Sequence, residues 1–446
     1  MNKIQLKEHE KINYSDNNYK EILEKKFFSQ KSSNRGFCLG LEKSSFCNLN
    51  ASYYIGLDWI KEHDLYAVVY PKRNYDFLSL FAEALSINSV GEANYFSQYF
   101  GIYYDKPEIE VSSTMMELFS PLLMIQYVFL LKRLVKHGLK KDYIHISENL
   151  NSKIKGRILF SPHYTKNVIK KREDHIYCGY CVYSENIPEN RLLKKALLVV
   201  KKTLHSMNSI KQQKCFSMIA LEINNLTSSF STVSDELVLS QVKNRSSNKL
   251  YKEYPDAVKL AKFILKHFDY SIQCHDAKQL CIPFWIDMSR LFEMHVYYVL
   301  NKAYPNKIQF QVKGSHETKV DFIKTDEKLI IDAKYKPKYN SGDTGIVEDI
   351  REIAGYARDE VILRKLFEKK EDISSVIPKC LIIAPVDTDM PNNTIKVHTF
   401  NSSKKELYSQ AQDINNFLNF RKLLVNLPTI KKVEKKRSSF DESSNS

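Results

Sequence analysis

The sequence predicts a mixed α+β protein, with a small β-rich domain that includes helices at the N-terminus and an α/β domain at the C-terminus. Three observations support this fold class. Residues 53–60 and 65–71 are rich in β-branched and aromatic side chains, which is typical of short strands. Residues 115–139 and 189–207 carry apolar side chains at helical spacing. Beyond residue 286, the pattern alternates between helix and strand.

The first two strands are separated by Lys61-Glu62-His63-Asp64, a turn-like interval that favours a hairpin. Residues 75–86 follow with apolar side chains at helical spacing, which predicts a helix laid over the strands. These side chains are Phe77, Leu80, Phe81, Ala84 and Leu85.

Two long helices are predicted in the middle of the chain. Residues 115–139 are apolar at nearly every turn, but Gln126 interrupts the longest apolar run, so a buried helix is favoured over a membrane span. Residues 228–249 are polar and are interpreted as a connection between domains or as a polar helix face. The second helix, 189–207, has a single apolar stripe formed by Leu192, Leu193, Ala196, Leu197 and Val200.

The C-terminal part has the order helix, three strands, helix and strand, which predicts an α/β domain. The final stretch is basic and then Ser-rich, which is typical of a disordered tail. We therefore divide the chain into a small β-rich domain (1–110), a mainly helical region (111–255), the α/β domain (256–430) and the tail (431–446). The elements expected in the α/β domain are 286–303, 308–313, 319–323, 328–335, 347–367 and 379–385.

The chain has 67 Lys and Arg residues against 52 Asp and Glu residues, a net charge of +15. Sequence-independent affinity for nucleic acid comes largely from such cations, so nucleic acid is a leading candidate partner. The alternative is that an AT-rich genome encodes many lysines and the charge only keeps the protein in solution. The N-terminus lacks an apolar stretch that could act as a signal peptide, which predicts a cytoplasmic protein without a membrane partner.

The eight cysteines do not form the paired clusters of a disulfide framework or a closed zinc site, so reduced thiols are expected. Cys178-Gly-Tyr-Cys181 follows His175 and has ligand-like spacing. A structural zinc site needs a second pair of ligands nearby, and none follows. An apolar strand is therefore favoured over a metal site.

The candidate chemistry lies in Val320-Asp321-Phe322 and in the strand that ends Asp332-Ala333-Lys334. Side chains alternate along a strand, so Asp332 and Lys334 project from the same face. If residues 325–328 form the turn of a hairpin, the antiparallel register places Asp321 opposite Asp332. The two β-carbons would then lie about 5 Å apart, close enough for both carboxylates to reach one cation.

Two carboxylates at that distance repel each other unless a metal or a proton neutralises them. Mg²⁺ fits because it prefers oxygen ligands, keeps several waters and lowers the pKa of an attacking water. The ammonium of Lys334 can orient that water, help to deprotonate it or stabilise charge on a phosphate. The alternative is a surface ion pair between Asp332 and Lys334, with Asp321 only beginning a turn.

These residues resemble the PD-(D/E)xK nuclease superfamily and, within it, the McrC family of nuclease subunits from McrBC-type (5-methylcytosine) restriction systems. The likeness extends over most of the chain. Its strongest landmarks are the segments 286–293, 332–336 and 349–357, together with Asp321. Weaker ones are Tyr54-Ile55-Gly56, Pro71-Lys72, Lys155-Gly156-Arg157-Ile158 and Glu189-Asn190-Arg191-Leu192.

The resemblance implies a restriction-endonuclease-like C-terminal domain with Mg²⁺, or Mn²⁺, as cofactor. Asp321 and Asp332 would be metal ligands, with Ala333 as a third contact to the metal. Lys334 would be the catalytic lysine, and Glu293 the acidic residue on the preceding helix, although Glu293 could instead be a solvated helix residue.

Glu352 and Tyr356 are helically spaced and would support the site, although core packing explains the tyrosine nearly as well. Val320 stands where the motif usually has Pro, and Glu352 where relatives often carry Gln. Neither departure removes a ligand.

The resemblance also implies double-stranded DNA as substrate and a separate AAA+ GTPase, similar to McrB, as partner. The chain would stimulate this GTPase and would join an oligomeric complex through it. The complex would serve in defence against phage. The chain contains no phosphate-binding G-x₄-G-K-[ST] loop, so nucleotide hydrolysis would come from that partner. Two alternatives remain open: a non-cleaving module that activates a partner NTPase, and a stand-alone repair nuclease.

Overall fold

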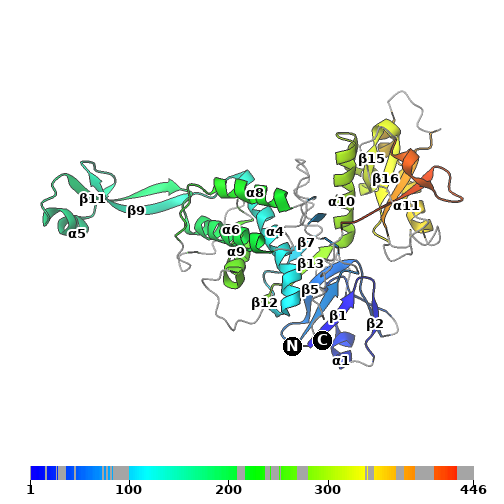
Figure 1. Ribbon diagram of the computed structural model, residues 1–446, viewed down its shortest axis with the longest axis horizontal. Coiled ribbons are helices and arrows are strands. Elements are labelled where there is room, and N and C mark those ends of the chain that lie inside the picture. The colour runs from blue at the N-terminus through cyan, green and yellow to red at the C-terminus, as the bar shows by residue number, and fades with distance from the viewer. Residues whose placement is uncertain are drawn as a thin grey trace, which may run out of the picture.

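The computed structural model describes residues 2–15, 18–26, 28, 37–44, 47–72, 75–76, 79–80, 83, 100–207, 216–236, 242, 251, 253–268, 280–336, 339, 346–367, 376–386 and 406–428. Over these ranges the chain is a mixed α+β protein in which residues 284–303 link an N-terminal sheet to a C-terminal sheet. A group of long helices packs beside the N-terminal sheet, and a two-stranded arm projects from these helices (Figure 1).

The N-terminal sheet has the strand order β1-β6-β5-β13-β7. Strands β5 (Tyr54–Lys61) and β6 (Leu65–Tyr70) form the predicted hairpin, and β1 (Asn2–Lys7) pairs with β6 in parallel. Strand β13 (Phe284–Asp287) lies between β5 and β7 (Phe100–Ile102), although it is distant in sequence. This sheet therefore places the start of the C-terminal half directly on the N-terminal strands.

Gly56 permits the close pairing of β5 with β13. Its φ is +136°, and a Cβ at this position would lie 2.2 Å from the carbonyl oxygen of Phe284. Only glycine tolerates both the backbone conformation and the close approach. A smaller sheet, β2-β4-β3, lies beside this one and comprises β2 (Lys11–Asn13), β3 (Glu42–Lys43) and β4 (Asn48–Asn50), while α1 (Lys20–Lys25) lies between β2 and β3 in sequence.

Four helices form the middle of the molecule: α4 (Ser113–His137), α6 (Pro188–Ser206), α8 (Phe216–Ser229) and α9 (Tyr254–Phe268). The first two confirm the predicted helices, and the apolar stripe expected on α6 is fully buried. The hydroxyl of Tyr254 donates a hydrogen bond to Asn190 (3.0 Å) and so fastens α9 to α6. The boundary proposed between residues 255 and 256 falls inside α9, which packs on α6 and α4.

The arm was not predicted from sequence. Strands β9 (Asp142–Asn151) and β11 (His175–Ser184) pair along their full length, and the short strand β10 (Arg157–Ile158) pairs with β11. A helical turn, α5 (Phe160–His163), continues into a π-helical segment (Tyr164–Val168) at the tip. Cys178 and Cys181 lie on β11, as expected for a strand, with Cys178 buried and Cys181 exposed, so they do not form a shared site.

The C-terminal sheet has the strand order β14-β15-β16-β17-β19-β18. Its strands are β14 (Ile308–Lys313), β15 (Lys319–Lys324), β16 (Leu329–Ala333), β17 (Lys379–Pro385), β18 (Gln412–Asp413) and β19 (Phe420–Val425). Strands β14 to β16 are antiparallel neighbours, whereas β16, β17 and β19 run in parallel.

Helices cover the C-terminal sheet on two sides. Helix α10 (Met288–Ala303) packs with Phe322 and Ile331 in the large core that continues into the N-terminal half. Helices α11 (Val347–Tyr356) and α12 (Glu360–Leu366) pack with Ile330 and Ile382 in a second core. The sheet is therefore a layer between α10 on one face and α11 with α12 on the other, which is a common way to bury both faces of parallel strands.

Several expectations differ from the structure. The helix predicted over 347–367 is divided into α11 and α12, because Asp359 accepts the backbone N–H groups of Val361 and Ile362 and starts a new helix. The strand β13 precedes α10, so the helix expected from residue 286 begins at Met288. Most of the helix predicted over 75–86 and the tail from 431 lie outside the described residues.

No helix within the described ranges combines the length and the apolar content that crossing a membrane requires.

Candidate metal-dependent site

The hairpin of β15 and β16 has the register predicted from sequence. Phe322 pairs with Ile331, and Lys324 pairs with Leu329. A 3₁₀ turn over Thr325–Glu327 joins the strands, and Lys328 closes it in the left-handed conformation. Continuing this register by one residue places Asp321 opposite Asp332.

The two aspartates meet at the end of this hairpin. Asp321 Oδ2 accepts a hydrogen bond from the backbone N–H of Ala333 (2.9 Å). Asp332 is 3% exposed, and its Oδ2 lies 2.9 Å from Lys334 Nζ as an ion pair. This oxygen is buried, and the ammonium of Lys334 is its charged neighbour. A buried carboxylate needs a positive partner, which an ammonium or a metal ion can supply.

Burial raises the pKa of the Asp321 carboxyl well above its usual range, and the negative charges of Glu293 and Asp332 raise it further. Burial also raises the pKa of Asp332, although Lys334 opposes this shift. Three acidic side chains therefore share a poorly solvated space in which they cannot all ionise freely. A bound cation would take the place of the retained proton.

Glu293 joins the site from α10, whose first turn is capped by Asp287 accepting the backbone N–H of Arg290 (3.1 Å). Glu293 is 5% exposed, and its Oε2 lies 2.8 Å from the guanidinium of Arg290. Its Oε1 accepts a hydrogen bond from the side-chain amide of Gln311. Glu293 is therefore a buried, paired residue and not the solvated helix residue considered from sequence.

Arg290 and Gln311 were missed from sequence. The carboxyl charges of Glu293, Asp287 and Asp321 outweigh the effect of burial and raise the pKa of Arg290, so its cation lies close to the site. Gln311 has φ of 49°, which is uncommon for a residue other than glycine, and it lies on β14 beside β15. Strained backbone of this kind concentrates at functional sites. Neither feature can be read from spacing alone.

Lys334 is held between two carboxylates. Its Nζ lies 2.9 Å from Asp332 Oδ2 and 2.8 Å from Glu352 Oε2, and Glu352 Oε1 accepts a hydrogen bond from Tyr356 Oη (2.9 Å). Burial opposes the charge on Lys334, but Asp332 and Glu352 outweigh it and raise the pKa of the ammonium. Lys334 is therefore a cation at neutral pH, which suits it to stabilise negative charge more than to accept a proton.

The residues present fit a divalent cation that retains water ligands. Within the described ranges, no group of three or more His, Cys, Asp or Glu side chains has the spacing needed to hold a metal ion by side chains alone. A cation at the hairpin would be held by the carboxylates of Asp321 and Asp332 and by the backbone carbonyl of Ala333, with water completing its shell. Mg²⁺ is commonly bound in this way, through one or two carboxylates.

Two further buried carboxylates lie next to the site and were also missed. Asp349 on α11 is 3% exposed; it accepts a hydrogen bond from Tyr339 Oη (2.7 Å) and forms an ion pair with Lys336. Glu8 follows β1, and its Oε2 accepts a long hydrogen bond from Tyr335 Oη (3.4 Å). This contact connects the N-terminal sheet to the residue that follows Lys334.

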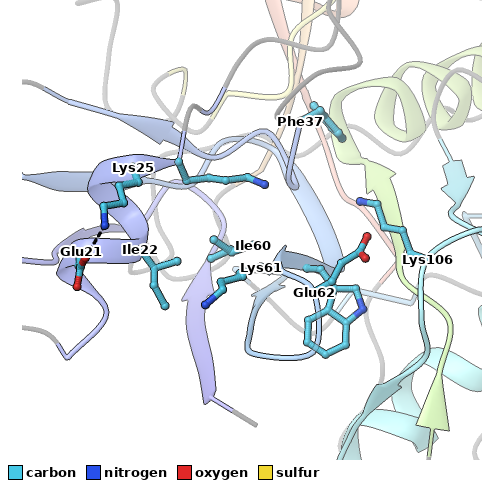
Figure 2. Close-up of a pocket in the computed structure, with 10 residues that line it drawn as sticks. Glu21, Ile22, Lys25, Phe37, Ile60, Lys61, Glu62 and Lys106 are labelled. Carbon is cyan, nitrogen blue, oxygen red and sulfur yellow. Dashed lines mark hydrogen bonds and ion pairs between the residues drawn. The ribbon is translucent and has the colours of Figure 1, made fainter.

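A cavity of about 750 Å³ lies elsewhere, beside α1 and the end of β5 (Figure 2). Its lysines are largely neutralised, because Lys25 pairs with Glu21, Lys61 pairs with Asp64 (2.6 Å) and Lys106 pairs with Asp58 (2.5 Å). None of the predicted site residues lines it.

The chain shows only a weak likeness to solved structures. No curated protein sequence matches the chain. Among solved structures, a chain of the "refined half-complex from tetradecameric assembly of Thermococcus gammatolerans McrB AAA+ hexamers with bound McrC" is 14% identical over 95% of this chain and 94% of its own, with a TM-score of 0.38. A chain of the Thermococcus gammatolerans McrBC complex is 14% identical over 68% of this chain and 88% of its own, with a TM-score of 0.29.

The assignment rests on the family model instead. The model for "McrBC 5-methylcytosine restriction system component" matches residues 97–350, which is more than half of the chain. The matched range contains Glu293, Asp321, Asp332 and Lys334. The chain therefore belongs to the family of McrBC 5-methylcytosine restriction system components.

Proposed function

We propose that this chain is the nuclease subunit of a McrBC-like restriction complex and that it hydrolyses DNA phosphodiesters with Mg²⁺ or Mn²⁺. One observation carries the proposal: the hairpin brings the carboxyl of Asp321 and the buried carboxyl of Asp332 together with the ammonium of Lys334. A surface ion pair, the competing interpretation, would not bury Asp332 to 3% exposure.

Each side chain has a distinct task in this proposal. The carboxylates of Asp321 and Asp332 hold the cation, which when bound supplies a Lewis acid and a more acidic water. Lys334, kept protonated by Asp332 and Glu352, stabilises the charge that grows on the phosphate oxygens. Glu293 and Arg290 lie on α10 at the same site, where Arg290 balances the charge of Glu293 and can contact a phosphate.

We assign the C-terminal sheet with α10, α11 and α12 to a PD-(D/E)xK, restriction-endonuclease-like domain. The assignment is supported by the antiparallel hairpin that carries the acidic residues, by the parallel strands that follow it and by the acidic residue on the preceding helix. Strand β13 connects this domain to the N-terminal sheet.

The proposed partner is a separate AAA+ GTPase similar to McrB. The chain lacks a phosphate-binding loop of its own. One similar solved structure is described as McrB AAA+ hexamers with bound McrC, and the other as a McrBC complex. We place the docking surface in the N-terminal half, on the small β-rich domain and the long helices.

The test is cleavage of supercoiled DNA with Mg²⁺, with and without the partner GTPase and GTP, by the wild-type chain and by Asp332→Ala. Metal-dependent cutting is expected only in the full mixture, and none from the variant. Cutting by the lone chain would indicate a stand-alone nuclease. Stimulation of the GTPase without any cutting would indicate a non-cleaving activator, and unchanged cutting by Asp332→Ala would refute the site.

A further inference from the structure

Arg290 lies between the acidic side chains of the proposed metal site and the solvent. Its guanidinium is 2.8 Å from Glu293 Oε2, the only ion pair that it forms with a described residue. The side chain of Arg290 is 47% exposed, whereas Glu293 is 5% exposed. Asp287 accepts the backbone N–H of Arg290 and holds the start of α10, so the arginine side chain can turn toward solvent without disturbing the helix.

The charge of Arg290 serves more than one carboxylate. Burial opposes this cation, but the negative charges of Glu293, Asp287 and Asp321 outweigh burial and raise the pKa of the guanidinium. Carboxylates that are removed from water need a cation close by, because their own charges repel one another. Arg290 therefore supplies to Glu293 and Asp321 part of the positive charge that a bound metal ion would supply.

Both oxygens of Glu293 are engaged in the structure. Oε2 faces the guanidinium of Arg290, and Oε1 accepts a hydrogen bond from the side-chain amide of Gln311. Gln311 is held in a strained backbone conformation, with φ of 49°. If Arg290 turned away, one oxygen of Glu293 would become available to a cation or to its water, while Gln311 would still orient the other.

We propose that Arg290 is an exchangeable counter-ion that couples metal binding to DNA binding. It neutralises Glu293 and Asp321 while the site lacks a metal, and it turns to a DNA phosphate when a divalent cation takes over that charge. The inference rests on the proposed function, because DNA and the cation are the ligands. A guanidinium suits the second task, since it binds phosphate oxygens through two parallel hydrogen bonds. Each ligand then strengthens the binding of the other, by the same factor.

The alternative is a permanent ion pair along a helix, as Arg364 forms with Glu360 on α12. The side chains of that pair are 63% and 65% exposed, so water screens both charges and the pair neutralises no buried group. Glu293 is buried beside two further acidic side chains, and its cation reaches solvent. The two pairs contain the same residue types in the same domain, so Arg364 and Glu360 are matched controls.

The first measurement is DNA affinity by fluorescence anisotropy, with the full chain and a short duplex in EDTA or in Mn²⁺. Partner and GTP are omitted, and a denaturing gel checks that the duplex stays intact. Mn²⁺ should raise the DNA affinity of wild type about tenfold. Arg290→Gln should bind like wild type in EDTA, where Glu293 holds the arginine, but should gain nothing from Mn²⁺. Arg364→Gln should keep the gain.

A second variant tests the release of Arg290 directly. Glu293→Gln removes the charge that holds the guanidinium, so it should bind DNA in EDTA about tenfold more tightly than wild type, as wild type does with Mn²⁺. Glu360→Gln removes the same charge and releases Arg364 on α12, and it should bind DNA like wild type. Equal DNA affinities of Glu293→Gln and Glu360→Gln in EDTA would contradict the proposal.

The second measurement is Mn²⁺ affinity, from the electron paramagnetic resonance signal of free Mn²⁺. Without DNA, Arg290→Gln should bind Mn²⁺ about tenfold more tightly than wild type, because the competing cation is gone. DNA should then add nothing to the variant, whereas it should raise the Mn²⁺ affinity of wild type by the same factor by which Mn²⁺ raises DNA affinity. A variant with a damaged fold would lose Mn²⁺ affinity, so the expected gain separates exchange from a structural role.

Unchanged or weaker Mn²⁺ binding by Arg290→Gln would overturn the proposal, and so would a variant whose DNA affinity still rises with Mn²⁺. Failure of the proposed function would look different. The exchange at Arg290 would be observed, yet no cutting would occur with Mg²⁺, the partner and GTP. Cutting by a wild-type chain that shows no coupling would instead remove this inference and leave the proposed function in place.

Discussion

Asp321 Oδ2 accepts the backbone N–H of Ala333 at 2.9 Å, across the two strands of the hairpin. The bond orients the Asp321 carboxylate toward Asp332, the residue just before Ala333. It uses one oxygen of Asp321, and the Asp321 carboxyl also forms a hydrogen bond with Asp332. The hairpin therefore brings together two carboxylates whose mutual repulsion only a proton or a cation relieves.

Asp321→Asn should stabilise the protein without metal and abolish its response to Mg²⁺. The amide oxygen can still accept from Ala333, but the buried charge is gone. Because the pKa of Asp321 is raised in the folded chain, folding favours its protonated form, and stability falls as pH rises through that raised pKa. Thermal unfolding at pH 5 and pH 8 should show this fall in wild type and a smaller one in the variant.

Mg²⁺ at pH 8 should raise the unfolding temperature of wild type but not of Asp321→Asn. Asp326→Asn, a half-exposed position on the turn of the same hairpin, is the control and should retain the response. If Mg²⁺ stabilises Asp321→Asn as strongly as wild type, Asp321 is not a ligand.

Lys334→Gln should reduce cleavage about 10²- to 10³-fold, because it removes the cation that stabilises the developing phosphate charge. The stabilisation by Mg²⁺ should persist, since both carboxylates remain. Initial cleavage rates in the full mixture with partner and GTP measure the effect, and Lys313→Gln, at the exposed end of β14, is the control. Loss of less than threefold would exclude a role for Lys334 in the chemistry.

Glu8→Gln should weaken the pH dependence of stability. Burial raises the pKa of Glu8 from 4.5 to about 7, although the Lys72 N–H and Tyr335 oppose this shift. The folded chain therefore holds this proton more tightly than the unfolded chain. The protonated Glu8 contributes to the free energy of unfolding fully below pH 4.5, and this contribution is lost as the pH rises from 4.5 to about 7. The loss is on the order of 3 kcal/mol.

Urea unfolding at pH 5 and pH 8 measures this difference. The variant keeps an oxygen for the Lys72 N–H (2.9 Å) but has no proton to exchange. Glu42→Gln, at an exposed position of β3, is the control. An unchanged difference between the two pH values in Glu8→Gln would show that Glu8 does not titrate with folding.

Gly56→Ala should destabilise the chain by about 3 kcal/mol, because the new Cβ meets the Phe284 carbonyl oxygen and φ is +136°. Gly138→Ala is a matched control: φ there is +87°, but nothing lies within 4 Å of a Cβ, so only the smaller backbone strain remains. Chemical unfolding of the two variants separates steric contact from strain. Equal losses would mean that the pairing of β5 with β13 tolerates a side chain here.

Local patterns were sufficient for much of the fold. The hairpin of β5 and β6, the helices α4 and α6, and the elements β14 to β17 were all read from periodicity, because alternation and helical spacing reflect which face of an element is buried. The register that places Asp321 opposite Asp332 was predicted from the length of the turn at residues 325–328. The arm was not predicted, because its exposed strands lack the apolar alternation that marks a half-buried sheet.

By itself, the sequence determined the family landmarks, the β15–β16 hairpin and the placing of two carboxylates and a lysine on it, because those residues are close along the chain and their geometry follows from backbone rules. The tertiary structure decided what depends on distant segments: the burial of Asp332, the contacts of Glu293 with Arg290 and Gln311, the link from Glu8 to Tyr335 and the insertion of β13 into the N-terminal sheet. Desolvation and long-range pairing depend on which elements pack together, and no spacing within one segment contains that information.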